Sequence, residues 1–153
     1  KMIELAKRKT SKIIKNNKRV KVNFQRKDIT KINLKKSNLI ISVLLFPFLN
    51  LDQRKALLKK IYKSLNSGGA FICVEKIRAK NSYFEDILNQ MYFDFKLSKN
   101  LREEEILNKA KSLRSSMYLF DEKKSKSLLE SAGFKNYEFF FKCFNFIGYI
   151  AIR

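Results

Sequence analysis

The chain has 153 residues, of which 34 are lysine or arginine, 14 are aspartate or glutamate and none is histidine. This length fits one domain with a substantial core, and a hydrophobic content of 45% argues against a disordered chain. Without histidine, Ser-His-Asp and Cys-His catalytic sites are excluded, and a zinc site would have few ligands. The longest apolar run, residues 39–49, is too short to span a bilayer.

The formal net charge of +20 is concentrated near the start, because residues 1–36 carry 14 basic and two acidic side chains. Such a charge can mark a surface that binds phosphates. It can equally be a compositional bias spread over a solvated surface, since 26 of the 34 basic residues are lysine. Both readings stay open. The cysteines, Cys73 and Cys143, lie in apolar runs without CxxC spacing, which predicts buried free thiols in a reducing cytoplasm.

The first third of the chain predicts one helix and two strands. Residues 1–17 place apolar side chains on one side of a helix. Residues 20–24 alternate between apolar and polar side chains, which predicts a strand. Residues 38–46 form an apolar run of strand type, and Pro47 ends it because proline cannot continue a central ladder.

Residues 52–75 predict a helix, a glycine turn and a buried strand. The apolar stripe of the helix is made by Leu57, Leu58, Ile61 and Leu65, with lysines and arginine on the outer face. Residues 66–69, which end in a pair of glycines, are expected to end the helix. Residues 70–74 are expected to form a strand that is covered on both faces. This order is typical of an α/β crossover.

The remaining residues predict three helices and a hairpin. Helices are expected over residues 82–97 and 103–116, the second with its apolar side chains inward: Ile106, Leu107, Ala110 and Leu113. Asp121 is a good N-cap for a third helix that Gly133 closes. Residues 137–153 are aromatic and β-branched, so a bend near residues 143–144 would make them a β-hairpin, in which Gly148 permits close packing.

Three stretches carry a resemblance to a known family: LNSGGAFICVEK, LLESAGF and FKCFNF. Together they resemble the class I S-adenosylmethionine-dependent methyltransferases, and more narrowly the carboxy-S-adenosylmethionine synthases. The similarity runs over residues 2–153. It implies the C-terminal part of a Rossmann-like α/β methyltransferase fold that ends in an antiparallel hairpin. It also implies one partial domain, residues 1–153, with a helical arm at about residues 82–116.

The resemblance implies an activity and its partners. In that family S-adenosylmethionine and prephenate give carboxy-S-adenosylmethionine and phenylpyruvate, without a metal or a protein nucleophile. The product serves tRNA wobble-uridine modification through a partner enzyme, and the family is cytoplasmic and homodimeric. Two alternatives stay open: an S-adenosylmethionine-dependent methyltransferase acting on another substrate such as RNA, and a degenerate, non-catalytic remnant.

The same resemblance assigns five positions to the site. Asp28 would accept a hydrogen bond from the adenine amino group, and the backbone amide of Ile29 would meet the ring. Val43 stands where the family has an asparagine near the methionine moiety, and Ala110 stands where the family has its carboxylate-binding arginine. Arg114 could substitute for that arginine from one turn further on. From the residues alone, the favoured interpretation is a turn residue at Asp28 and a surface arginine at Arg114.

The glycines, at positions 68, 69, 133 and 148, form no Gly-x-Gly motif. The resemblance implies that the glycine-rich loop and the ribose-binding acidic residue precede residue 1. We therefore expect a fragment or a decayed gene, in which the strand over residues 38–46 exposes an edge.

Overall fold

The computed structural model describes residues 2–17 and 19–153, and the chain divides into two compact units, Lys1–Ile32 and Asn33–Arg153. In the first unit, helix α1 covers Met2–Asn16, so the helix predicted there is confirmed. The prediction of a strand over residues 20–24 is wrong, because the described part of this unit contains no strand. Val20 and Val22 are exposed, and alternation alone forms no strand without a partner for the backbone hydrogen bonds.

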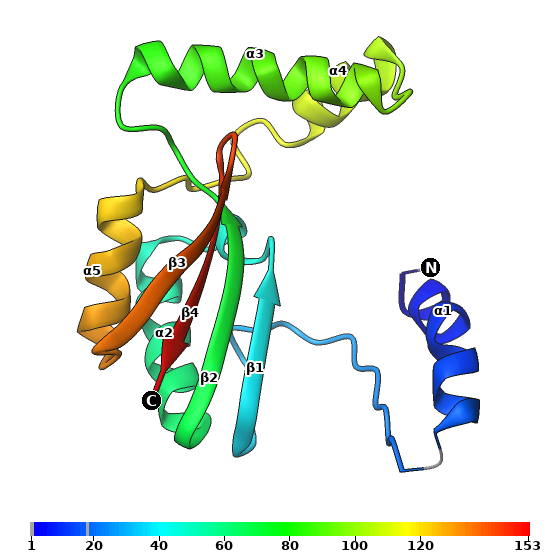
Figure 1. The fold of residues 1–153 in the computed structure, drawn as a ribbon, viewed down its shortest axis with the longest axis vertical. Coiled ribbons are helices and arrows are strands. Elements are labelled where there is room, and N and C mark those ends of the chain that lie inside the picture. The colour runs from blue at the N-terminus through cyan, green and yellow to red at the C-terminus, as the bar shows by residue number, and fades with distance from the viewer. Residues whose placement is uncertain (1, 18) are drawn as a thin grey trace. The chain divides into compact units, whose positions relative to one another are not determined.

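The second unit is built on a four-stranded mixed sheet in the order β1-β2-β4-β3 (Figure 1). The strands are β1 (Ser37–Val43), β2 (Leu65–Lys76), β3 (Asn136–Cys143) and β4 (Phe146–Ile152). β1 and β2 are parallel, whereas β4 is antiparallel to both β2 and β3. The predicted α/β class and C-terminal hairpin are confirmed, with the bend at residues 144–145.

Helix α2 (Leu51–Ser64) makes the crossover between β1 and β2, and a short 3₁₀ turn (Phe46–Phe48) precedes it. Asn50 and Gln53 form a capping box at its start. The prediction that residues 66–69 end the helix is wrong, because these residues already belong to β2. Their backbone is used by the sheet: Gly68 N–H donates to the Arg153 carbonyl, and Arg153 N–H donates to the Gly69 carbonyl. Gly68 takes a φ of +72° within this irregular stretch.

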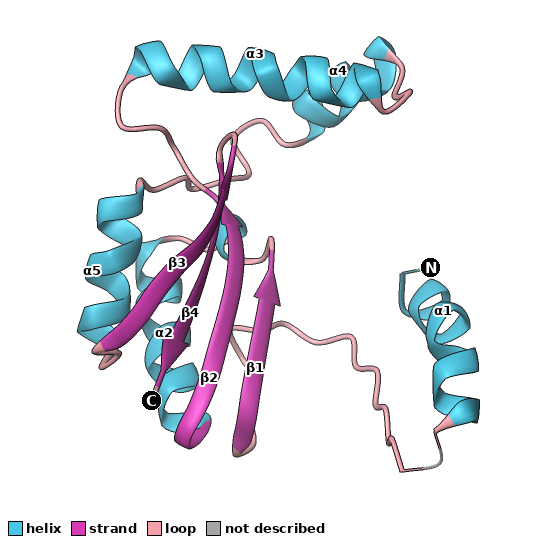
Figure 2. Ribbon diagram, viewed as in Figure 1, coloured by secondary structure: helices cyan, strands magenta, loops and turns pink. Residues whose placement is uncertain are grey.

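The core lies on one face of the sheet, which α2 and α5 (Glu122–Ala132) cover (Figure 2). Phe71 of β2 is fully buried there and its ring contacts Phe46, Phe134 and Tyr149. The prediction that residues 70–74 are covered on both faces is wrong, since burial alternates along β2. Both helices lie on the same side, and the side chains of β1 that face the other way are exposed: Leu39, Ile41 and Val43.

Helix α5 begins and ends as predicted. The Asp121 carboxylate accepts from Lys124 N–H at 2.7 Å, and Gly133 closes the helix with a φ of +111°. At Gly148 of β4 a Cβ would come within 3.1 Å of Phe140 and Phe141, which explains the absence of a side chain there.

The helical arm consists of α3 (Ser82–Ser98) and α4 (Glu103–Ser112), which lie beyond the end of the sheet where the β3–β4 hairpin turns (Figure 1). Tyr92 and Phe95 of α3 contact the ring of Phe144 at this turn. Of the side chains expected inward on the second arm helix, Ile106 is buried, whereas Leu107 and Ala110 are exposed, so that prediction is wrong in part. The buried face of α4 is narrower than the apolar pattern of its sequence suggests, because Ile106 is the residue of this helix that is buried.

Of the two cysteines, Cys73 is buried as predicted, but Cys143 is exposed at the end of β3. Cys143 lies on β3, the outer strand of the sheet formed by the described residues, so its apolar neighbours in sequence do not bury it. Within residues 2–17 and 19–153 no helix is both long and apolar enough to cross a membrane.

Candidate functional site

The carboxyl ends of the parallel strands β1 and β2 meet at one edge of the sheet, where ligands usually bind in α/β folds. Val43 is the last residue of β1, lies beside Val74 in the register and is 62% exposed. Leu44 follows in the left-handed region with a φ of +55°, and its N–H donates to the Val74 carbonyl at 2.7 Å. A bulky residue rarely adopts this conformation, and such outliers concentrate at binding sites.

Asp28 and Ile29 belong to the first unit, where they form a turn. One carboxylate oxygen of Asp28 accepts from the N–H and the hydroxyl of Thr30, at 2.9 and 2.7 Å. The hydrogen bonds from Thr30 hold the pKa of the Asp28 carboxyl below its ordinary value. Asp28 is therefore a turn-forming residue whose second carboxylate oxygen is not used by the turn.

Ala110 and Arg114 belong to the second unit, and both are exposed. Ala110 lies in the last turn of α4, which ends at Ser112. Arg114 lies beyond the helix end, in a turn where its N–H donates to the Lys111 carbonyl at 3.2 Å. Its side chain therefore leaves from a turn and not from the helical face that carries Ala110.

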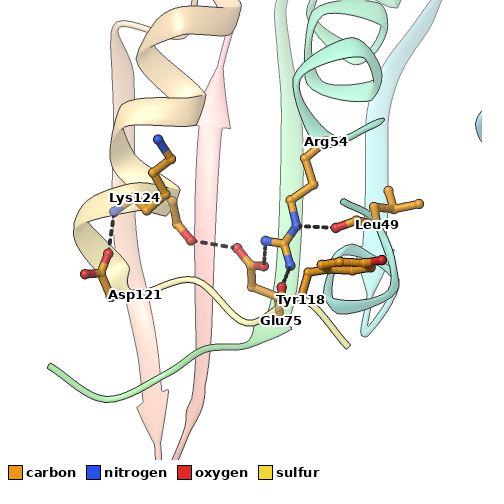
Figure 3. A network of polar contacts seen from close by, with 7 residues as sticks. Leu49, Arg54, Glu75, Tyr118, Asp121 and Lys124 are labelled. Carbon is orange, nitrogen blue, oxygen red and sulfur yellow. Dashed lines mark hydrogen bonds and ion pairs between the residues drawn. The ribbon is translucent and has the colours of Figure 1, made fainter. Parts of the chain in front are cut away.

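A buried ion pair lies beneath the carboxyl edge, and sequence analysis did not find it (Figure 3). Arg54 of α2 donates to the Glu75 carboxylate of β2 at 2.9 Å, and both side chains are almost inaccessible to solvent. Arg54 also donates to the carbonyls of Leu49 and Tyr118, at 3.1 and 2.6 Å. The second oxygen of Glu75 accepts from the Ser125 hydroxyl at 3.0 Å. The network thus joins α2, β2, α5 and the segment that leads into α5.

Two spacings in the sequence could have located this pair. Arg54 precedes Leu57 by three residues and Leu58 by four, which places it on the buried stripe of α2 and not on the outer face. Glu75 continues the alternation of Phe71 and Cys73 along β2, so it shares their buried side. The available signal was therefore a charged residue at a position where the helical spacing of α2, or the alternation of β2, expects an apolar one.

Burial governs the protonation of Glu75 and of two groups near the pair, Cys73 and Tyr149. It raises the pKa of the Glu75 carboxyl, and the positive charge of Arg54 opposes that rise. It also raises the pKa of the Cys73 thiol to about 12 and that of the Tyr149 hydroxyl well above its ordinary value. Cys73 is thus a neutral thiol and no nucleophile at neutral pH.

A second polar cluster fastens the arm to the sheet. The Asn145 amide at the hairpin turn donates to Asn89 and to the Glu85 carboxylate, at 2.9 and 3.2 Å. The other oxygen of Glu85 accepts from Ala79 N–H at 2.6 Å. Asn145 is the asparagine of the FKCFNF stretch, so that motif holds α3 against the β3–β4 turn. Among the described residues no group of three or more metal-ligating side chains is placed to hold a metal ion.

Residues 1–151 match the ubiE/COQ5 methyltransferase family. The chain belongs to this family. Two curated proteins that the chain resembles are carboxy-S-adenosyl-L-methionine synthases. The protein of Staphylococcus epidermidis is 38% identical over 126 residues, which are 82% of this chain and 55% of that protein. The protein of Cronobacter sakazakii is 34% identical over 126 residues, 82% of this chain and 51% of that protein. The chain thus spans about half the length of these relatives.

Solved structures confirm the methyltransferase fold. Human N-acetylserotonin methyltransferase, solved in complex with S-adenosylmethionine, superimposes with a TM-score of 0.56 at 19% identity, over 86% of this chain and 33% of that one. The pyocyanin biosynthetic protein PhzM superimposes with a TM-score of 0.65 at 11% identity, over 97% of this chain and 39% of that one. At these identities the likeness is one of fold.

Proposed function

We propose that the protein is a carboxy-S-adenosyl-L-methionine synthase, which converts S-adenosylmethionine and prephenate to carboxy-S-adenosylmethionine and phenylpyruvate. The observation that carries the proposal is the 38% identity over 126 residues to the synthase of Staphylococcus epidermidis. The exposed carboxyl edge of β1 and β2, with Leu44 in the left-handed region, supports a ligand site at Val43. The product would serve tRNA wobble-uridine modification through a partner enzyme in the cytoplasm.

The residues present fit the adenine end of S-adenosylmethionine better than its methionine end. Asp28 is an ionised carboxylate with one oxygen outside its turn, so it can accept from an amino group, and Ile29 follows it with a backbone amide. Val43 offers only apolar contact where an amide would hydrogen-bond the methionine moiety. When bound, the cofactor supplies the activated carbon beside the sulfonium that takes up the carboxyl group.

Binding of the substrate carboxylate is assigned to Arg114, because Ala110 has no donor. A guanidinium binds a carboxylate with two parallel hydrogen bonds, which an exposed arginine on a turn can offer. Catalysis would then consist of positioning and charge stabilisation, with no side chain acting as a nucleophile.

The proposal is tested by native mass spectrometry of the protein purified as its gene encodes it. Retained carboxy-S-adenosylmethionine is the expected result, and Arg114→Ala should lower its retention while Lys111→Ala, one turn away, should not. Retained S-adenosylmethionine alone would support an ordinary methyltransferase. A protein that retains neither and binds neither when they are added would contradict the proposal and support a non-catalytic remnant.

An RNA substrate is the second candidate, and the charge of residues 1–36 favours it. Phosphate contacts release counterions, so affinity for tRNA should fall by orders of magnitude between about 50 and 200 mM salt. The measurement is a filter-binding titration of the protein with tRNA at several salt concentrations. Absence of binding at the lowest salt concentration would mean that the positive charge reflects amino-acid composition and not an RNA-binding surface.

We also propose a homodimer formed through the helical arm, residues 82–116. No residue of α3 is buried, and five of its large apolar side chains are exposed: Tyr83, Phe84, Met91, Phe93 and Phe95. An apolar helix that stays open to solvent in one copy is typical of a surface covered by a second.

A further inference from the structure

We propose that the outer face of α2 binds the phosphate backbone of an RNA duplex without reading its sequence. The face carries a row of three lysines that are four residues apart, Lys55, Lys59 and Lys63, called here the lysine row. All three are exposed, and their backbone positions are about 6 Å apart along the helix. The row lies outside residues 1–36, and the inference does not depend on either activity proposed above.

The lysine row is not compensated within the protein. Like charges four residues apart on a helix repel one another. None of the three side chains forms an ion pair or a hydrogen bond with a described residue. The one acidic residue of α2, Asp52, lies in the first turn, where the helix dipole favours a negative charge. Helices α3, α4 and α5, by contrast, each have at least two acidic residues among their basic ones.

Further positive charge lies at the end of the row. The Lys36 amino group donates to the Lys63 carbonyl at 2.9 Å, and the Arg153 guanidinium donates to the same carbonyl at 3.3 Å. Both contacts are exposed, so these two cations are held beside the last lysine of the row without an acidic partner. The C-terminal end of α2 therefore gathers three cations on one surface. Such a surface raises the local concentration of a polyanion.

The outer face of α2 offers charge without apolar contact. Every residue of this helix is described, and its large apolar side chains Leu57, Leu58 and Ile61 are all buried. A helix that lies on a membrane needs exposed apolar side chains beside its lysines. A protein partner would need aromatic or aliphatic residues at the centre of the interface. A phosphate backbone needs only cations, so it is the partner that this face fits.

The packing of α2 favours an RNA duplex over DNA. α2 lies beside α5 in one layer, and Tyr62 of α2 contacts the ring of Phe134 just after α5 (Figure 1). A helix embedded in a layer cannot enter the wide major groove of B-DNA as a recognition helix does. The major groove of an RNA duplex is narrow, and its phosphates are contacted without reading the bases. The lysine row, about 12 Å long, can reach phosphates of both strands across that groove.

The test is fluorescence anisotropy of the full chain with a labelled RNA duplex of about 16 base pairs, at several salt concentrations. Two duplexes of unrelated sequence should bind equally, because α2 exposes no side chain suited to reading bases. An RNA single strand of the same length should bind more weakly, since α2 exposes no aromatic side chain on which bases could stack. A DNA duplex should also bind more weakly. Equal binding of the single strand or of the DNA duplex would overturn the proposal.

Matched charge variants locate the binding. Replacing Lys55, Lys59 and Lys63 together by glutamine should weaken binding of the RNA duplex by at least about tenfold. The slope of log K against log salt should become shallower by about three, one for each phosphate contact removed. The control replaces three exposed lysines of the first unit by glutamine and removes the same charge: Lys21, Lys27 and Lys31. An effect of the control as large as that of the α2 variant would overturn the proposal.

Two further measurements separate the proposal from its alternatives. The α2 variant should resist urea at least as well as the unmodified protein, because it loses like-charge repulsion and glutamine suits a helix as well as lysine does. Vesicles of phosphatidylserine and phosphatidylcholine should not bind through α2, and binding that the α2 variant abolishes would assign the face to a membrane and overturn the proposal. Retention of carboxy-S-adenosylmethionine should be unchanged in the α2 variant, so failure of the proposed function is measured separately.

Discussion

At the scale of single residues, the Arg54–Glu75 pair is the feature with the largest energetic consequence. Both side chains are inaccessible to water, so each depends on the other and on the Leu49, Tyr118 and Ser125 groups for its hydrogen bonds. Such a pair contributes little when intact, because desolvation offsets attraction, but removal of one partner leaves a buried charge without compensation.

We expect Glu75→Gln to lower the free energy of unfolding by about 3–5 kcal/mol, because Arg54 would remain charged and buried. The measurement is urea-induced unfolding followed by circular dichroism. Lys126→Gln removes one partner of a surface ion pair and should lower the free energy of unfolding by less than about 1 kcal/mol. Equal effects of the two variants would contradict the assignment of the network in Figure 3.

The residues of the candidate site divide by what the sequence can reveal. Asp121 and Gly133 are recognisable because a cap and a left-handed closure depend on neighbours within one turn. The partner of Asn145 could not be predicted, since Glu85 lies 60 residues away and the two meet only after α3 packs on the hairpin. The role of Arg114 depends on where α4 ends, which is among the least certain features of a sequence pattern.

At the scale of elements, the closure of α5 provides a clear test. Gly133 has a φ of +111°, and a Cβ there would lie 2.9 Å from the Tyr62 ring, which Phe134 holds in an edge contact. Gly133→Ala should therefore lower the free energy of unfolding by more than the ~1–2 kcal/mol of left-handed strain alone. The same urea unfolding experiment measures the change.

Gly68→Ala is the matched control, because Gly68 also has a positive φ but a Cβ at this position would meet no atom within 4 Å. Gly68→Ala should lower the free energy of unfolding only by the cost of the backbone strain, without a steric clash. A Gly68→Ala effect as large as that of Gly133→Ala would mean that the Tyr62 ring moves aside freely.

Elements that carry their own signals were predictable from sequence, and those that depend on partners were not. The helices with caps and apolar stripes and the aromatic hairpin are found where expected. Residues 20–24 alternate as a strand does, but the described part of the first unit contains no strand that could pair with them. Residues 66–69 contain a glycine pair of the kind that often closes a helix, yet they belong to β2 and their hydrogen bonds go to Arg153 at the far end of the chain. Local pattern cannot reveal either outcome.

At the scale of the whole molecule, the exposed apolar surface of α3 predicts self-association. Met91 is half exposed on α3, so Met91→Glu should place a charge in the proposed interface and shift a dimer toward monomer. Sedimentation velocity at several concentrations measures the change. Met2→Glu adds the same charge to exposed α1 and should have no effect. A wild-type monomer at the highest concentration would contradict the proposed dimer.

The position of β4 in the sheet has a consequence for how the protein forms during synthesis. β4 follows the other three strands in the chain, but it lies between β2 and β3 and pairs with both. Until residues 146–152 have left the ribosome, β2 has one neighbour and β3 has none. The nascent chain therefore presents an open edge of β2 and an unpaired β3 until then, and the sheet closes only when β4 emerges.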